Sequence, residues 1–223
     1  MTSDGNGDAA VTAQSNGLKV LALVDLHWPG EGHPLSLPRL EGIDLVLLGG
    51  DLTHFRGVDE ARRIVDEIRA AGPTVRAVCG NCDRPEIEQW LSAEGLGLDR
   101  RAERIDDLRL VGLSAGLPFG GCPYERTEEE FASALDEAWT RARECEAPVT
   151  VLLSHQPPHG VCDTARGQHV GSRAVRAAIQ QHRPELVICG HIHEAAGRGH
   201  LGGSAVINPG PWFAGGELRF EVT

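Results

Sequence analysis

From Leu18 onward, apolar runs of strand length alternate with amphipathic runs of helix length, a pattern typical of β-α units around a parallel sheet. We predict strands at 19–24, 45–48, 75–79, 108–113, 149–153 and 186–189. We predict helices at 59–71, 85–93, 127–144 and 173–182. Thr127 and Glu130 fit a capping box, and Ser172 fits an N-cap. Short runs broken by Gly and Pro, at 205–208 and 218–222, indicate antiparallel hairpins that close the sheet. The sequence therefore predicts an α/β fold in which two sheets pack face to face with helices outside.

The first 17 residues are small and polar, so we predict a disordered N-terminal tail there. Residues 18–223 contain enough apolar side chains for one sizeable core, and no linker composition divides them. We therefore expect a single domain over 18–223.

Acids, histidines and one asparagine follow five of the six predicted apolar strands, at the point where each strand ends. The five motifs are Asp25-Leu26-His27, Gly50-Asp51, Gly80-Asn81-Cys82-Asp83, Ser154-His155 and Gly190-His191-Ile192-His193. Because ligands bind beyond the carboxyl ends of strands in open α/β sheets, we expect these side chains to converge. Carboxylate oxygens with imidazole nitrogens suit Mn²⁺, Fe, Zn²⁺, Co²⁺ or Ni²⁺ better than Ca²⁺ or a structural zinc held by thiolates. The pattern predicts two adjacent cations bridged by Asp51, which lower the pKa of a shared water so that hydroxide can attack phosphorus.

These motifs resemble the calcineurin-like metallophosphoesterase superfamily, over about residues 18–208. The longer strings GDLTHF, GNCDRPE, SHQPPHG, HVGSRAVR, ICGHIHEA and INPGP look like a small single-domain prokaryotic branch of predicted phosphoesterases with a GNCD motif. The resemblance implies a four-layer α-β-β-α sandwich, in which two mixed sheets are flanked by helices. It implies a first metal held by Asp25, His27, Asp51 and His193, and a second held by Asp51, Asn81, His155 and His191. We assign Asp51, Asn81 and His155 to catalysis and expect Mn²⁺, with Fe, Zn²⁺, Ni²⁺ or Co²⁺ as alternatives.

One position departs from the family pattern. Many members carry a histidine after the asparagine of the third motif, where it can protonate the leaving oxygen, but this chain has Cys82. A thiol with an ordinary pKa near ~8.5 is a poor substitute for that acid. We therefore expect leaving groups that need little protonation, or slow turnover, and interpret Cys82 as a neutral neighbour of the metals and not as a nucleophile. This favours a phosphodiesterase over a phosphomonoesterase.

Several other residues are weaker candidates, and a purely structural role stays open for each. His54 follows Asp51 by three positions, and Asp83 could orient a metal-bound imidazole. We predict that the segment 157–172 is a loop overhanging the site, with backbone amides at Ser172 that offer an anion site. The candidates for substrate contact from this region are His159, His169 and Arg173.

Two other functions compete with hydrolysis. Relatives in eukaryotic sorting complexes share the implied fold but act as scaffolds, although a scaffold does not need seven metal-binding positions. Cys79 and Cys82 match the Cys-x-x-Cys spacing of redox proteins, but Cys82 lies inside the metal pattern. The glycine pattern of 197–202 is that of a dinucleotide site, yet it lacks the strand before and helix after, so we predict a hairpin turn.

The composition limits the classes of molecule that this chain is expected to bind. The formal net charge of −11 makes nonspecific nucleic-acid binding unlikely, because phosphate backbones require clustered Lys and Arg. No apolar run approaches the ~18 residues of a membrane span, and no signal-peptide pattern is present, so we expect a cytoplasmic protein without membrane contact. The six cysteines have no framework spacing and are expected to be reduced. The expected partner is a small phosphoester substrate, and both a monomer and a homodimer stay open.

Overall fold

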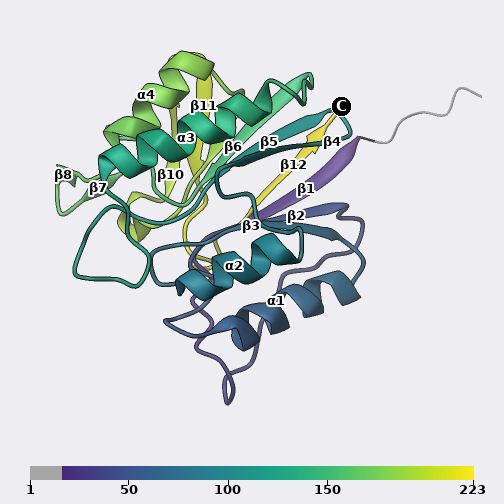
Figure 1. Cartoon of the computed structure of the whole chain (residues 1–223). Helices are drawn as coiled ribbons and strands as arrows, with labels where there is room; N and C mark the ends of the chain where they lie inside the picture. Colours follow the sequence, from purple (N-terminus) through teal and green to yellow (C-terminus); the bar gives the residue numbers. More distant parts are fainter. Residues whose placement is uncertain (1–16) are drawn as a thin grey trace, which may run out of the picture.

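The computed structural model describes residues 17–223, so all but the last residue of the predicted tail lies outside the described residues. Figure 1 shows the arrangement of the elements. The main strands are β1 (Leu18–Leu23), β2 (Leu45–Gly49), β3 (Thr74–Val78), β4 (Arg101–Ile105), β5 (Leu108–Leu113), β6 (Val149–Ser154), β9 (Leu186–Ile188), β10 (Gly197–Leu201), β11 (Ser204–Asn208) and β12 (Leu218–Val222). The helices are α1 (Val58–Ala70), α2 (Pro85–Ala93), α3 (Glu128–Ala142) and α4 (Arg173–His182). The short elements are β7 (Thr164–Ala165), β8 (Gln168–His169) and the 3-10 helices η1 (His193–Ala195) and η2 (Trp212–Ala214).

Two mixed sheets form the centre of the molecule. The four-stranded sheet has the order β12-β1-β2-β3, and the six-stranded sheet has the order β10-β11-β9-β6-β5-β4. Strands at the middle of each sheet run parallel, while β12, β10 and β4 pair antiparallel at the edges. Helices α1 and α2 cover the outer face of the smaller sheet, and α3 and α4 cover the outer face of the larger one. This is the four-layer α-β-β-α sandwich that the sequence predicts.

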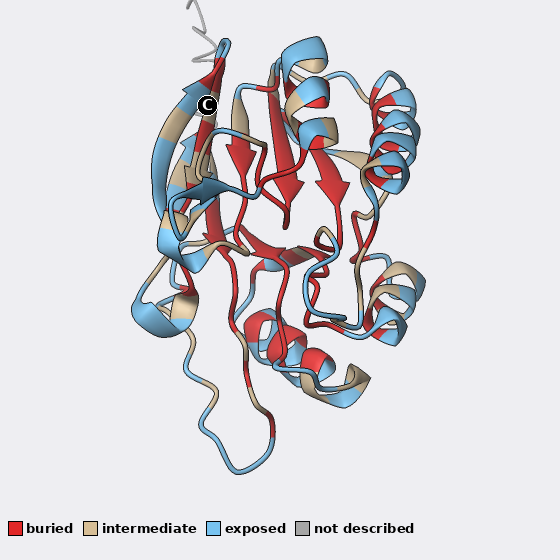
Figure 2. Cartoon of the chain, turned by 90° about the vertical axis from the view of Figure 1, so that its left-hand side faces the viewer, coloured by how far each residue is buried: buried red, intermediate tan, exposed pale blue. Residues whose placement is uncertain are grey.

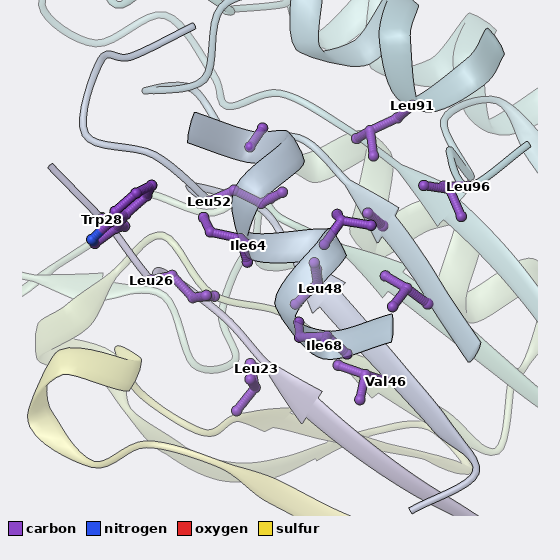
Figure 3. Packing of buried hydrophobic residues seen from close by; sticks show 14 of the residues in the cluster. Leu23, Leu26, Trp28, Val46, Leu48, Leu52, Ile64, Ile68, Leu91 and Leu96 are labelled. Carbon is purple, nitrogen blue, oxygen red and sulfur yellow. The ribbon is translucent and has the colours of Figure 1, made fainter. Parts of the chain in front are cut away.

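The core has three layers of buried side chains. Between the sheets, Leu47 and Val78 from one sheet belong to the same cluster as Leu110 and Leu153 from the other. Outside the smaller sheet, the apolar face of α1 packs on β2 and its neighbours, as Ile64, Ile68, Val46 and Leu48 show in Figure 3. Burying each such side chain contributes about 1.5–3 kcal/mol. In Figure 2 the buried residues lie in the strands, on the inward faces of the helices and in several of the loops that follow the strands.

The predicted helix caps are present. The Thr127 hydroxyl accepts from the amide of Glu130, and the Glu130 carboxylate accepts in return from the amide of Thr127, as in a capping box. The Ser172 hydroxyl accepts from the amide of Val175 at the start of α4.

Some local predictions were wrong. Strand β4 was not predicted, because its sequence RAERI places charged residues among apolar ones at the edge of the larger sheet. The glycine-rich segment belongs to a hairpin, as predicted, but it is not a turn over its whole length. Residues Gly197–Leu201 form β10, which pairs antiparallel with β11, and only Gly202 and Gly203 make the turn. Strand β12 forms no hairpin with β11, since it pairs with β1 in the other sheet.

The parallel strands of both sheets end at one edge, where backbone hydrogen bonds join the loops that follow them. The amide of Asp25 after β1 donates to Gly50 O after β2, at 3.0 Å. The amide of Gly190 after β9 donates to His155 O after β6, at 3.1 Å.

Within the described residues, every helix is too short or too polar to cross a lipid bilayer.

Candidate metal centre

The structure brings the seven predicted metal-binding residues together at this edge. Potential ligand atoms of Asp25, His27 and His193 all lie within 4.8 Å of one another, and the same holds for Asp51, His155 and His191. Asn81 joins the second group, because its Oδ1 lies 3.1 Å from His155 Nε2. The two groups correspond to the two predicted cation sites.

Asp51 lies between the two groups. Its Oδ2 is 3.4 Å from His27 Nε2, in the first group, and its Oδ1 is 3.6 Å from His155 Nε2, in the second. The two oxygens of one carboxylate therefore face different groups. This is the arrangement that a bridging ligand requires.

In the second group, hydrogen bonding fixes the tautomer of one histidine. His155 Nδ1 lies 3.0 Å from Gly49 O, and a carbonyl can only accept, so Nδ1 carries the proton. In the neutral ring, Nε2 then presents a lone pair to Asn81 Oδ1, which is also an acceptor. Two buried acceptors facing each other are unfavourable without a positive group between them. A divalent cation fits this donor set.

The first group has the same character. The Nε2 atoms of His27 and His193 are 3.3 Å apart, and His193 Nε2 is 3.7 Å from Asp25 Oδ1. Two imidazole nitrogens and a carboxylate thus converge. These side chains also fit a divalent cation.

The electrostatics differ between the two ligand groups and favour a free lone pair on His191 and on His27, whereas the hydrogen bond with Asp25 raises the pKa of His193. Burial, with the neighbouring ring of His155, lowers the pKa of His191 to about 4. Burial also lowers the pKa of His27. Burial by itself would raise the pKa of Asp25, but its contacts with His193 and the other histidines outweigh it, so this pKa is lowered. Metal binding requires neutral imidazoles beside an ionised carboxylate, so a cation would have to displace the proton that His193 shares with Asp25.

The backbone at the site is strained. Asp25, His27, Asp51 and His191 all have positive φ, at 52°, 48°, 48° and 67°. This left-handed conformation costs a residue with a Cβ roughly 1–2 kcal/mol. Strain of this kind persists only where the surrounding structure imposes it, and it turns the side chains toward the centre.

Three glycines precede ligand residues because a side chain there would strike another ligand. A Cβ at Gly50 would collide with the ring of His155, and one at Gly80 would collide with Asp51. A Cβ at Gly190 would come within 2.6 Å of Asp25 Oδ2. The glycines of the second, third and fifth motifs are therefore required by close approach between loops.

Asp83 does not orient an imidazole, contrary to one prediction. Its carboxylate accepts from the amides of Leu52 at 3.1 Å, Thr53 at 2.9 Å and Gly80 at 2.9 Å. It therefore ties the loop that carries Asp51 to the loop that carries Asn81.

Sequence reasoning missed Asn208, whose amide supports the fifth motif. Asn208 Nδ2 donates to Ile192 O at 2.9 Å and to Gly190 O at 3.4 Å. The signal in the sequence is the string INPGP, which contributes to the family resemblance.

Cys82 lies close to both groups. Its amide donates to Asp51 Oδ1 at 2.8 Å, and its thiol lies within reach of His27 and Asp51. Burial, followed by the charge of Asp51, raises the pKa of the Cys82 thiol well above its ordinary value. This raised pKa favours the protonated thiol over the thiolate.

His54 lies at the rim. Its ring centroid is 5.6 Å from that of His27, and the residue is exposed.

The segment 157–172 contains the β7-β8 hairpin, and it contacts η1 next to His193 through Arg166, whose amide donates to Glu194 Oε2 at 3.1 Å. His169 Nδ1 lies 2.7 Å from the carboxylate of Asp163, and the ring of His159 lies 5.6 Å from that of His169. His159 and His169 therefore contact residues of their own segment. Neither belongs to the two groups of candidate ligands.

The predicted anion site at the start of α4 is filled by the chain's own carboxylate. Glu128 accepts from the amide of Arg173 at 2.7 Å, from the amide of Ala174 at 2.9 Å and from the Ser172 hydroxyl at 2.6 Å. The prediction of an open anion site was therefore wrong. Arg173 itself is exposed.

Several known proteins are similar to this chain in sequence or in structure. The sequence profile of the calcineurin-like phosphoesterase superfamily domain matches residues 18–218. An uncharacterised protein of Methanocaldococcus jannaschii is 28% identical over 205 residues, which cover 87% of this chain and 88% of the relative. A probable cyclic nucleotide phosphodiesterase of Synechococcus is 27% identical over 162 residues, which cover 70% of this chain and 61% of that protein. Among solved structures, a Thermus thermophilus protein superposes with a TM-score of 0.64 at 18% identity, covering 93% of this chain and 100% of its own.

Proposed function

The chain belongs to the calcineurin-like phosphoesterase superfamily, and we therefore propose that it hydrolyses phosphodiesters with two divalent cations bound at the candidate metal centre. The observation that carries the proposal is the position of Asp51, whose two carboxylate oxygens face the two ligand groups. A bridging carboxylate is what a two-metal hydrolase needs.

In this proposal, Asp25, His27, Asp51 and His193 hold the first cation, and Asp51, Asn81, His155 and His191 hold the second. When bound, the cations would generate hydroxide from a shared water near neutral pH and neutralise charge on the phosphoryl oxygens. Backbone groups of the chain position two of these ligands. Gly49 O holds the His155 ring in the tautomer whose Nε2 can bind a cation, and Cys82 N–H holds Asp51 in place. Mn²⁺ is the cation that we propose, with Fe, Zn²⁺, Ni²⁺ and Co²⁺ as alternatives.

A diester is favoured over a monoester because of Cys82. A thiol whose pKa is raised by burial and by Asp51 is a weak proton donor, so it assists a leaving group little. A phosphomonoester dianion depends more on such assistance than a diester does. The name of the Synechococcus relative, a probable cyclic nucleotide phosphodiesterase, supports the same choice. We further propose that the chain is a member of the small prokaryotic branch with a GNCD motif and acts in the cytoplasm, which its six free cysteines favour.

The test is an assay of metal-stripped protein with bis-p-nitrophenyl phosphate and p-nitrophenyl phosphate, with Mn²⁺, Ni²⁺, Co²⁺, Zn²⁺ and Mg²⁺ added singly. We expect one or more cations to restore cleavage of the diester, in preference to the monoester. Asp51→Asn should abolish this cleavage, whereas Asp66→Asn, the same change on the exposed face of α1, should not. Tight binding of a metal with no hydrolysis of either substrate would instead favour a scaffold.

A further inference from the structure

Phe213 is an exposed aromatic residue beside the first ligand group. Its side chain is 63% exposed, although it is a large apolar residue. Its ring centroid lies 5.9 Å from that of His27 and 5.5 Å from that of His193. An apolar ring held against two candidate metal ligands and open to solvent is available to a bound substrate.

The position of Phe213 is fixed by its neighbours. It lies in η2, where the amide of Trp212 donates to Val24 O at 3.1 Å and the Trp212 indole donates to Ser36 O at 2.7 Å. Val24 directly precedes Asp25, so the backbone that carries Phe213 is attached to the backbone that carries a candidate ligand. The chain thus keeps this ring next to the first ligand group.

A cavity of about 530 Å³ lies between η1 and η2 and contacts both Phe213 and His193. Its other walls are mainly apolar, including Ala196, Pro209 and Pro211. The charged residue in its lining, apart from the histidine, is Glu194. A carboxylate repels anions, so this cavity suits an uncharged group better than a second phosphate or a carboxylate. Its volume is in the range of small-molecule sites.

We propose that Phe213 and this cavity bind the ester group that stays on phosphorus, and that this group carries a flat, uncharged aromatic ring such as an aryl group or a nucleobase. The inference rests on the proposed function. In an in-line displacement, the leaving group departs opposite the attacking oxygen. Phe213 stands beside the candidate ligands His27 and His193, so it lies within reach of an ester group of a phosphate bound there, and we assign it to the group that does not leave. Flat rings stack favourably on an exposed phenylalanine.

Binding can be measured without turnover, by titration calorimetry of the metal-loaded protein with benzylphosphonate and ethylphosphonate. In both compounds a CH₂ group replaces the ester oxygen, and only one carries a ring. We expect the wild type to bind benzylphosphonate about tenfold more tightly than ethylphosphonate. Phe213→Ala should remove most of this preference and leave the affinity for ethylphosphonate unchanged, while Phe213→Trp should restore the preference. Phe119→Ala is the matched control, because Phe119 is 75% exposed and, within residues 17–223, forms no ring contact with the candidate metal-binding histidines.

A second measurement separates this inference from the proposed function. Phenyl p-nitrophenyl phosphate and methyl p-nitrophenyl phosphate share a leaving group and differ in the retained group. We expect kcat/KM to favour the phenyl ester in the wild type but not in Phe213→Ala. An equal preference in both proteins, or no preference for benzylphosphonate in the wild type, would overturn the role of Phe213 even if hydrolysis is confirmed. A Phe213-dependent preference in binding, without hydrolysis of either ester, would support the ring site and reject the hydrolase.

Discussion

Asn81 Oδ1 lies 3.1 Å from His155 Nε2, and this contact spans the two sheets of the sandwich. Asn81 follows β3 of the four-stranded sheet, whereas His155 follows β6 of the six-stranded sheet. A cation held by both residues would therefore link the two sheets, and its binding free energy would add to the free energy of unfolding.

Metal binding should raise the melting temperature. A cation present at 100 times its Kd stabilises the folded state by about 2.7 kcal/mol. For a domain of this size we expect the Tm to rise by roughly 5–10 °C. Scanning calorimetry of metal-stripped protein with and without Mn²⁺ measures this shift. Asn81→Ala should show a smaller shift, and Asp66→Asn should match the wild type. Equal Tm values with and without every cation tested would contradict a metal centre that joins the sheets.

Replacing Cys82 should change the choice of substrate. Cys82→Ser keeps a small neutral side chain, so diester hydrolysis should change less than about threefold, because a thiol with a raised pKa is an inefficient proton donor. Cys82→His places a general acid next to Asn81 and should raise hydrolysis of phenyl phosphate, whose leaving group needs a proton more than p-nitrophenolate does, by about tenfold or more. Steady-state kinetics on both substrates measure these changes. Loss of diester hydrolysis in Cys82→Ser, with metal still bound, would show that the thiol takes part in the reaction.

Glu128 should stabilise the start of α4. Glu128→Gln weakens its hydrogen bonds to Ser172, Arg173 and Ala174 and should lower the free energy of unfolding by about 1 kcal/mol. Urea unfolding measures the change. Glu129→Gln removes the same charge from the same helical turn at an exposed position, so it should cost less. Equal losses in the two variants would mean that the contact with α4 contributes nothing beyond the helix dipole.

Stability should fall as pH rises through the range in which Glu88 titrates. Burial, with the charge of Asp99, raises the pKa of Glu88 from 4.5 to about 7. Between these values the folded chain keeps a proton that the unfolded chain has released, so the free energy of unfolding decreases with increasing pH. We expect this group to contribute a loss of about 2 kcal/mol between pH 5 and pH 8. Glu88→Gln, which can still accept from the Ser114 hydroxyl, should lack this component in urea unfolding. The same pH slope in the variant would assign the effect to another group.

The parts of the fold and site that sequence reasoning predicted depend on short-range patterns. Apolar periodicity located the central strands and the four helices, and the rule that ligands lie at the carboxyl ends of parallel strands placed Asp25 and His155 at one edge. The parts it missed depend on pairing between distant segments. Strand β4 has no apolar run and is a strand because β5 pairs with it. Glu128 reaches the start of α4 only after α3 and α4 pack, and Phe213 reaches His27 only after β12 returns to β1.

The glycines that precede the candidate ligands couple the conformations of different loops. Each of these glycines leaves room for a ligand on a different loop: Gly50 for His155, Gly80 for Asp51 and Gly190 for Asp25. An alanine at Gly80 would therefore displace Asp51 as well as disturb its own neighbour, Asn81. A substitution at one of these glycines therefore displaces a ligand on a different loop. Suppressor mutations that restore the site should map to the loop of the displaced ligand more often than to the loop that carries the substitution.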